Sequence, residues 1–299
     1  MRSNVFNMTP KQALRARFVA RVLLTFLCVI VAVMCLFPIA VLFINVTRSS
    51  NEIAKGFSFA FGSSFGENFS LLMKYLSDND YSLIVSFFNS ALISILSTSV
   101  SIYFSALTAY AIHVYDFKGK AFFEKFLLVL IIIPSQLGAV GFFLMAKKYL
   151  ALSPYINQTY LSYAIFILPA IAGASTVYYI KQYMKNNFSL EYVDAARMDG
   201  ASEFRIFNTI CLPFIKSSLA TMALFGIISS WNNFMGPLTF LKNHELFTFP
   251  QVAYQIGKET SIDYGAQYMG IFITALPMLL VYIFMNRIIM KGTAAGGIK

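Results

Sequence analysis

Few residues in this chain have the types and spacing that covalent chemistry requires. Gly62-Ser63-Ser64-Phe65-Gly66 fits G-x-S-x-G, the turn that presents the nucleophile of many serine hydrolases. That turn needs a strand before it, a helix after it, and an acid and a histidine further along the chain. Of the two histidines, His113 and His244, the first is predicted on the opposite side of the apolar segments described below. We therefore interpret residues 62–66 as a flexible glycine-serine loop.

Patterns for nucleotide and metal sites are also missing. Gly257-Lys258-Glu259-Thr260 contains a lysine, but no glycine-rich loop precedes it to hold phosphate groups. Two histidines and three scattered cysteines give no cluster with metal-ligand spacing. The sequence thus predicts a chain that is not an enzyme and that holds no catalytic residue, cofactor or metal of its own.

The composition places the chain in a membrane. Of its 299 residues, 58% are hydrophobic and 12% are charged, with 31 phenylalanines and 17 tyrosines. The net charge of +10 does not form one patch, because most basic residues flank apolar segments, and this argues against nucleic-acid binding. No ionisable side chain lies deep in an apolar segment, which argues against an ion-coupled carrier.

Six apolar segments are long enough to cross a bilayer as helices, so we predict an all-α integral membrane protein with one transmembrane domain over residues 1–299. The first resembles a signal peptide in its charge order, but it is too long and lacks a cleavage site. The second is rich in serine and threonine, which allow helices to approach closely. Pro134 and Pro169 interrupt the third and fourth, either as packed kinks or as discontinuous helices that line a pathway. The six segments are residues 22–44, 83–112, 126–145, 158–180, 214–234 and 265–286.

Lysine and arginine in the connecting segments predict the orientation. Most lie in the N-terminus, residues 113–125, residues 181–216 and the C-terminal tail, and few lie in residues 45–81, 147–157 and 238–264. Basic connections remain in the cytoplasm. We therefore expect both termini to be cytoplasmic, and residues 45–81 and 238–264 to form extracellular loops.

A pathway for a neutral, hydroxyl-rich solute would use amides, hydroxyls and aromatic faces in the spans. The same groups also serve helix packing and the lipid interface, and the sequence leaves the two roles open. The candidates for the solute pathway are Asn89, Gln136, Tyr163, Asn232 and Asn233.

The longest strongly polar segment, residues 189–213, lies between two of the most apolar ones. Ser189 can cap a first helix, and Glu191 complements the dipole of that helix. Asp199-Gly200 predicts a turn, because glycine accepts left-handed backbone angles. A second short helix is expected from Ala201 to Pro213, which gives a cytoplasmic helix-turn-helix.

Within this segment, VDAARMDGASEFRIFNTICLP resembles the EAA loop of ABC-importer permeases, the cytoplasmic loop that docks on the ATPase subunit. Asp194-Ala195-Ala196 stand where that family has Glu-Ala-Ala, and Asp199-Gly200-Ala201 match its Asp-Gly-Ala. Asp194 is shorter than the family's glutamate, and Ser217 stands where a proline is common. The whole chain is similar to the maltose-permease-like, carbohydrate-uptake branch of the family.

The resemblance implies a permease subunit of an ATP-driven importer in a bacterial-type cell membrane, which moves a sugar or oligosaccharide by alternating access. It implies four partners: a second related permease, two ATPase subunits that carry the ATP and Mg²⁺, and an extracellular solute-binding protein. Glycerol-phosphate importers share this branch, so another polar solute is an alternative. A passive channel or ion-coupled carrier is the alternative from another class, with the EAA-like loop as an amphipathic surface helix.

The resemblance also assigns roles to two groups of residues. In the EAA-like loop, Phe204 and Phe207 would be buried aromatic anchors in the ATPase interface. The alternative is that the charged residues keep the loop solvated while the phenylalanines pack under the protein's own helices. The ATPase-docking candidates are Asp194, Ala195, Ala196, Arg197, Asp199, Gly200, Ala201, Phe204, Phe207 and Ile210, and the binding-protein candidates are Asn243, His244 and Glu245.

Overall fold

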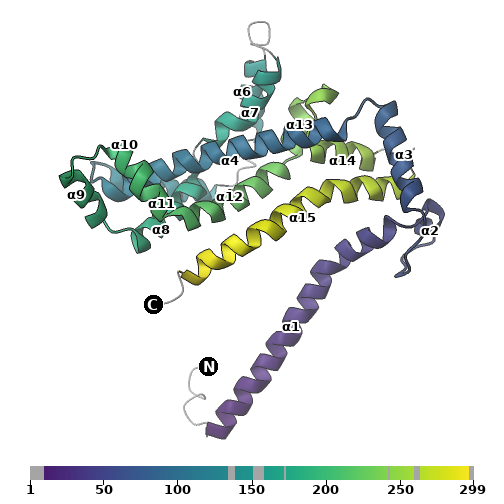
Figure 1. Cartoon of the computed structure of the whole chain (residues 1–299), viewed down its shortest axis with the longest axis horizontal. Helices are drawn as coiled ribbons and strands as arrows, with labels where there is room; N and C mark the ends of the chain where they lie inside the picture. Colours follow the sequence, from purple (N-terminus) through teal and green to yellow (C-terminus); the bar gives the residue numbers. More distant parts are fainter. Residues whose placement is uncertain are drawn as a thin grey trace. The chain divides into compact units, whose positions relative to one another are not determined.

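The computed structural model describes residues 10–133, 139–150, 158–171, 173–241, 243–258 and 263–295. Over these ranges the chain forms helices and turns, without a strand (Figure 1). One compact unit contains the described residues up to Tyr75 together with residues 263–272, and a second contains the rest. The two units are described one after the other. The all-helical prediction is therefore confirmed over the described part of the chain.

Three helical segments are long and apolar enough to cross a membrane: Arg17–Asn45, Leu83–Val114 and Tyr264–Ile283. Two bent pairs pass the same test if each counts as one span. They are Leu161–Ala170 with Ala174–Asn187, bent by 40°, and Glu203–Phe214 with Lys216–Phe240, bent by 79°. Three to five spans thus follow from length and composition in the described residues, against six predicted. The predicted third span is divided between α5 (Lys120–Ile132) and α6 (Ala139–Leu150), and Pro134 lies outside the described residues.

The first unit contains α1 (Pro10–Asn45), α2 (Ser50–Ala54) and the first part of α3 (Phe65–Asp78). Asn68 on α3 is buried, and its side-chain amide donates to the carbonyl oxygens of Val46 and Arg48, at 2.8 and 3.0 Å. This amide fixes the end of α1 against α3. The sequence predicted a loop over residues 45–81, whereas the structure folds much of it into two helices.

The second unit is built around α4 (Leu83–Val114), which packs against α8 (Ala174–Asn187) and α12 (Lys216–Trp231) most extensively. Gly226 on α12 faces Thr98 so closely that a Cβ there would lie 2.8 Å from Thr98 Cγ2. The structure therefore shows the close packing that the serine-rich segment predicted. The small buried residues of α4 are Ser86, Ser90, Ser94, Ser97, Ser105, Ala106 and Ala109.

Shorter helices complete the second unit around α4. They include a π-helical turn, η3, which joins two short helices after residue 202. Their bounds are α7 (Gln158–Ile167), η2 (Leu168–Ala170), α9 (Glu191–Met198), α10 (Glu203–Ile206), η3 (Phe207–Cys211), α11 (Leu212–Phe214), α13 (Met235–Phe240), η4 (His244–Leu246) and α14 (Phe249–Lys258). The last helix, α15 (Tyr264–Ala295), is shared between the two units.

Residues 238–264, predicted as a polar loop, are largely helical where the structure describes them. Phe249, Val252 and Ile256 are buried along one face of α14. Their spacing of three and four residues is that of an amphipathic helix, which the intervening polar residues hid in the sequence. The segment therefore contributes to the core of the second unit.

Candidate docking loop and polar cavity

Residues 189–213, called the docking loop from here on, form two helices on either side of a glycine turn (Figure 1). The backbone N–H of Glu191 donates to Ser189 Oγ at 3.3 Å. The N-cap of α9 is Leu190, one residue later than predicted, and it makes no side-chain cap hydrogen bond. Gly200 has a φ of +75°, and the N–H of Ala201 donates to the carbonyl oxygen of Ala196 at 3.0 Å. This left-handed glycine ends α9, which confirms the predicted turn.

The second half of the docking loop continues beyond the predicted stop at Pro213. α10, η3 and α11 follow one another without a break, and Pro213 lies inside α11. The chain turns at Ile215 instead, by 79°, before it enters α12. Pro213 is therefore the last residue but one of this continuous helical segment, which ends at Phe214.

A charged bracket spans the glycine turn. Arg197 Nε donates to Glu203 Oε1 at 2.7 Å, and Arg197 Nη1 donates to Asp194 Oδ1 at 3.3 Å. Tyr110 Oη, near the end of α4, donates to Glu203 Oε2 at 3.1 Å. The two ion pairs of Arg197 are exposed, so each contributes little by itself. Tyr110, in contrast, is buried. Together these contacts fix the two helices of the docking loop to each other and to α4.

The same bracket sets the electrostatics of neighbouring groups. The hydrogen bond that Arg197 donates to Glu203, and then the negative charge of Glu203, raise the pKa of Arg197 above its usual value. The Arg197 guanidinium lies 5.9 Å from the centre of the Tyr115 ring. Burial, followed by the hydrogen bond to Glu203, raises the pKa of Tyr115. The hydrogen bond from Arg197 also lowers the pKa of Glu203, so both members of the Arg197–Glu203 pair stay charged across the physiological range.

The docking loop has an exposed face and a buried one. Ala196 and Val193 are buried, and Ala201 and Ile210 are half-buried. These apolar residues pack the docking loop against the rest of the second unit. Phe204 is 66% exposed. The remaining candidates on the exposed face are Asp194, Ala195, Arg197, Asp199 and Gly200.

Phe207 does not lie where the sequence analysis expected an anchor for a partner. Its side chain is completely buried, with ring centres 5.4 Å from Tyr110 and 5.7 Å from Tyr103. The expectation is corrected: Phe207 packs in the chain's own core, because η3 turns it toward α4 together with Ile206. Met198, which the sequence analysis missed, is 88% exposed beside the glycine turn. An apolar residue off the buried face of α9 was the signal that could have identified it.

Two of the solute-pathway candidates are used in packing. Asn89 is buried, and its amide nitrogen donates to the carbonyl oxygens of Glu245 and Phe247 at 2.8 and 3.0 Å. Tyr163 Oη donates to Asn89 Oδ1 at 2.7 Å. These contacts occupy the amide of Asn89, which fits the packing alternative. Gln136 lies outside the described residues.

Asn233, in contrast, borders a polar cavity of about 500 Å³ between α4, α8 and α12. Ser97 Oγ and Ser230 Oγ lie 3.0 Å apart across the α4–α12 contact. Thr98 Oγ1 is buried without a hydrogen-bond partner among the described residues. Asn232 is exposed next to Asn233 but does not line the cavity. The lining residues, none of them ionisable, are Ser97, Thr98, Ser101, Ile102, Phe166, Ala170, Ser175, Thr176, Met222, Phe225, Gly226, Ser229, Ser230 and Asn233.

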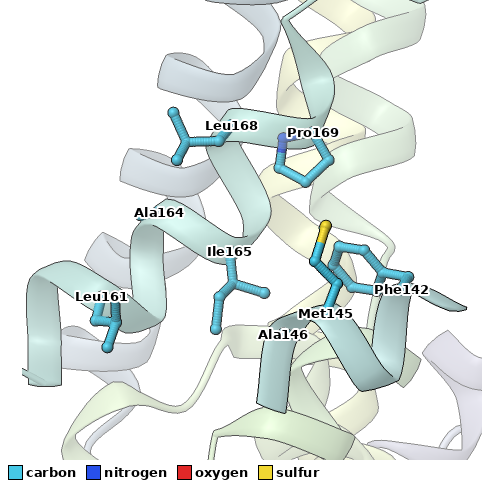
Figure 2. A pocket seen from close by; sticks show the side chains of 8 residues that line it. All are labelled: Phe142, Met145, Ala146, Leu161, Ala164, Ile165, Leu168 and Pro169. Atoms are coloured by element: carbon cyan, nitrogen blue, oxygen red, sulfur yellow. The ribbon is translucent and has the colours of Figure 1, made fainter. Parts of the chain in front are cut away.

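A second, smaller cavity of about 200 Å³ lies between α6 and the α7–η2 segment (Figure 2). Figure 2 shows Met145 and Phe142 on one side, with Ile165 and Pro169 facing them. All its lining side chains are apolar, so they offer no hydrogen bond to a polar solute. We therefore take the polar cavity, and not this one, as the candidate solute site.

The binding-protein candidates form a short ordered segment at η4. Asn243, His244 and Glu245 are exposed. The backbone N–H of Glu245 donates to Asn243 Oδ1 at 3.1 Å, and the His244 ring lies 4.8 Å from that of Tyr81. With the bonds from Asn89 to the carbonyl groups of this segment, these contacts give the exposed side chains a fixed platform.

Comparison with known proteins adds a family match. Residues 101–291 match the model of a family described as binding-protein-dependent transport system inner membrane component. An arabinooligosaccharides transport system permease protein of Halalkalibacterium halodurans is 37% identical over 219 residues, which are 71% of this chain and 73% of that protein. A trehalose/maltose transport system permease protein of Thermococcus litoralis is 27% identical over 96% of this chain and 99% of its own.

One solved structure shares the fold. It is the crystal structure of a bacterial ABC transporter involved in the import of the acidic polysaccharide alginate. The similarity has a TM-score of 0.72 and covers 91% of this chain and 97% of that one, at 20% sequence identity. At this identity the likeness supports the arrangement of helices and leaves the solute to other observations.

Proposed function

Because this chain belongs to the family of binding-protein-dependent transport system inner membrane components, we propose that it forms half of a translocation pathway for a sugar or oligosaccharide. As a member of that family it is a membrane transport subunit and not an enzyme. Import is driven by ATP that is hydrolysed on other subunits. Its partners in this proposal are a second related permease, two ATPase subunits and an extracellular solute-binding protein.

In this proposal six spans cross the membrane, with both termini and the docking loop in the cytoplasm. The excess of lysine and arginine on that side supports the orientation. The three apolar helices and two bent pairs supply up to five of the six spans. The sixth would join α5 and α6 across residues outside the described ranges.

The docking loop carries the proposal of coupling to an ATPase. Its exposed face presents Phe204 and Met198, the two most exposed large apolar side chains of the loop among the described residues. Such side chains form the centre of protein interfaces, and charged groups such as Asp194 form the rim. The Arg197–Glu203 bracket and Tyr110 tie this face to α4. A displacement of the loop by the ATPase would therefore move α4, whose side chains line the polar cavity.

The polar cavity favours a neutral saccharide over glycerol phosphate. Its hydroxyl and amide groups can exchange hydrogen bonds with sugar hydroxyls, and Phe166 and Phe225 add apolar faces. Phosphate groups are held by lysine, arginine or a helix N-terminus. The first turn of α8 lines the cavity through Ser175 and Thr176, but no basic side chain does, so a phosphate would find no full positive charge there. The names of the permeases similar to this chain support the same solute class.

The test uses the assembled transporter in proteoliposomes, with labelled arabinose oligosaccharide, maltose and glycerol phosphate. Ser101→Ala removes one hydroxyl from the lining of the cavity. Thr108→Ala is the matched control, because Thr108 lies on the same helix outside the lining and its hydroxyl donates to the carbonyl oxygen of Phe104. We expect saccharide uptake to fall in Ser101→Ala and to persist in the control. Equal uptake by both variants would refute the assignment of the cavity, and exclusive uptake of glycerol phosphate would refute the solute class.

A further inference from the structure

Three strongly exposed phenylalanines follow α2 in the first unit. Phe57, Phe59 and Phe61 are 55%, 73% and 70% exposed, and no charged residue occurs between Gly56 and Gly66. An uncharged cluster of large apolar side chains on a surface marks a contact with a lipid or a protein. The contacts of the cluster decide between the two.

The phenylalanine segment, residues 57–61, folds back along α1. The Phe57 ring lies 5.4 Å from that of Phe37, and the Phe59 ring lies 4.7 Å from that of Phe57. Phe37 belongs to the apolar stretch Arg17–Asn45 of α1. At about 1.5 Å per residue it lies about 12 Å before the end of the helix. Phe57 therefore lies beside the part of α1 that is apolar enough to be within the bilayer.

Polar contacts at the end of α1 hold this fold-back in place. Thr47 Oγ1 accepts from the N–H of Gly62 at 3.0 Å, and the Thr47 carbonyl oxygen accepts from the N–H of Ser64 at 2.8 Å. Arg48, which is buried, donates to the carbonyl oxygen of Gly56 at 3.2 Å. A Cβ at Gly62 would lie 2.8 Å from Arg48 Cα, so only glycine allows this approach. Both ends of the phenylalanine segment are thus fixed to α1.

We propose that residues 57–61 insert into the boundary between headgroups and acyl chains of the membrane in which α1 ends. Aromatic side chains are enriched at that level, where an apolar body meets a polar layer. The backbone N–H groups of Phe57, Phe59 and Phe61 have no partner among the described residues. They would be costly in hydrocarbon or in a dry interface with another subunit, but headgroup oxygens and water can accept from them. The segment is therefore a lipid-facing anchor and not an aqueous loop.

The test measures collisions of a nitroxide label with oxygen, which partitions into lipid, and with a nickel chelate, which stays in water. Labels are attached to Phe59→Cys and Phe61→Cys in the assembled transporter, reconstituted into phosphatidylcholine vesicles, with Cys28, Cys35 and Cys211 replaced by alanine. Both labelled positions are at the surface, so the substitutions leave the fold intact. Lys74→Cys, on the exposed side of α3, is the aqueous control.

At positions 59 and 61 we expect the ratio of oxygen to nickel collisions to be several-fold higher than at position 74. A ratio equal to that at position 74 would place the segment in water and overturn the proposal. Exclusion of both reagents would show that a partner subunit covers the segment, and this would overturn it as well. The outcome does not depend on the solute or on the role of the docking loop.

Discussion

Replacement of Phe207 by alanine tests the corrected role of this residue. The side chain is completely buried and contacts the rings of Tyr103 and Tyr110. Alanine would remove these contacts and leave a cavity beneath η3. Changes of this kind cost about 3–5 kcal/mol of unfolding free energy in protein cores. We expect Phe207→Ala to destabilise the chain by that amount, because the side chain belongs to a buried core cluster to which α4, α8 and the docking loop contribute.

Phe204→Ala is the matched variant, since the two phenylalanines lie one helical turn apart. Phe204 is 66% exposed, so its loss should change the unfolding free energy by less than about 0.5 kcal/mol. If it is a central contact for the ATPase, its loss should cost about 2 kcal/mol or more of subunit affinity, which is about a 30-fold rise in Kd. We thus expect Phe207→Ala to lower the stability of the chain and Phe204→Ala to lower its affinity for the ATPase.

Both quantities can be measured on the same preparations. Unfolding is followed by denaturant titration in mixed micelles, and ATPase affinity is measured by titration of the folded permease with the separate subunit. Unchanged stability of Phe207→Ala would contradict its burial. If Phe204→Ala retains the parent affinity, the docking surface lies elsewhere.

Three further predictions address the turn, the helix packing and the orientation. Gly200→Val should place a β-branched residue at a φ of +75°, at a cost of about 1–2 kcal/mol, and reduce uptake per ATP hydrolysed without loss of membrane insertion; normal coupling would contradict this. Gly226→Ala should push α12 away from Thr98 and lower thermal stability, and Thr98→Ser in the same chain should restore part of it by removing the methyl group in contact; no recovery would disprove the steric cause. A cysteine in place of Asn243 should react with an impermeant thiol reagent added to intact cells, and protection from the reagent would reverse the proposed orientation.

Local patterns with one dominant cause could be predicted from the sequence. The turn at Gly200 depends on backbone chemistry within a few residues. The close contact of α4 follows from its serines and alanines, which have little volume between helices. These features required no knowledge of distant parts of the chain.

Features that depend on a distant partner could not be predicted in this way. Phe204 and Phe207 are both apolar and close in sequence, and only the π-helical turn against α4 separates an exposed ring from a buried one. Asn89 is a candidate for solute contact by residue type, yet carbonyl groups 156 and 158 residues away use its amide. The orphan hydroxyl of Thr98 likewise becomes visible only when α12 is in place.

The length of α4 has a mechanical consequence for how the two ends of the transport pathway are coupled. Its 32 residues contain neither glycine nor proline and extend about 48 Å, so the helix has no built-in hinge. Near one end Tyr110 bonds to Glu203, and near the other Asn89 bonds to the backbone around η4; Figure 1 shows α9 and α10 at one end of this rod and α13 and α14 at the other. Because α4 is held by these contacts at both ends, a tilt of the helix at one end also moves the other end. Closing one gate while opening the opposite one would then need no relay of small rearrangements through the core.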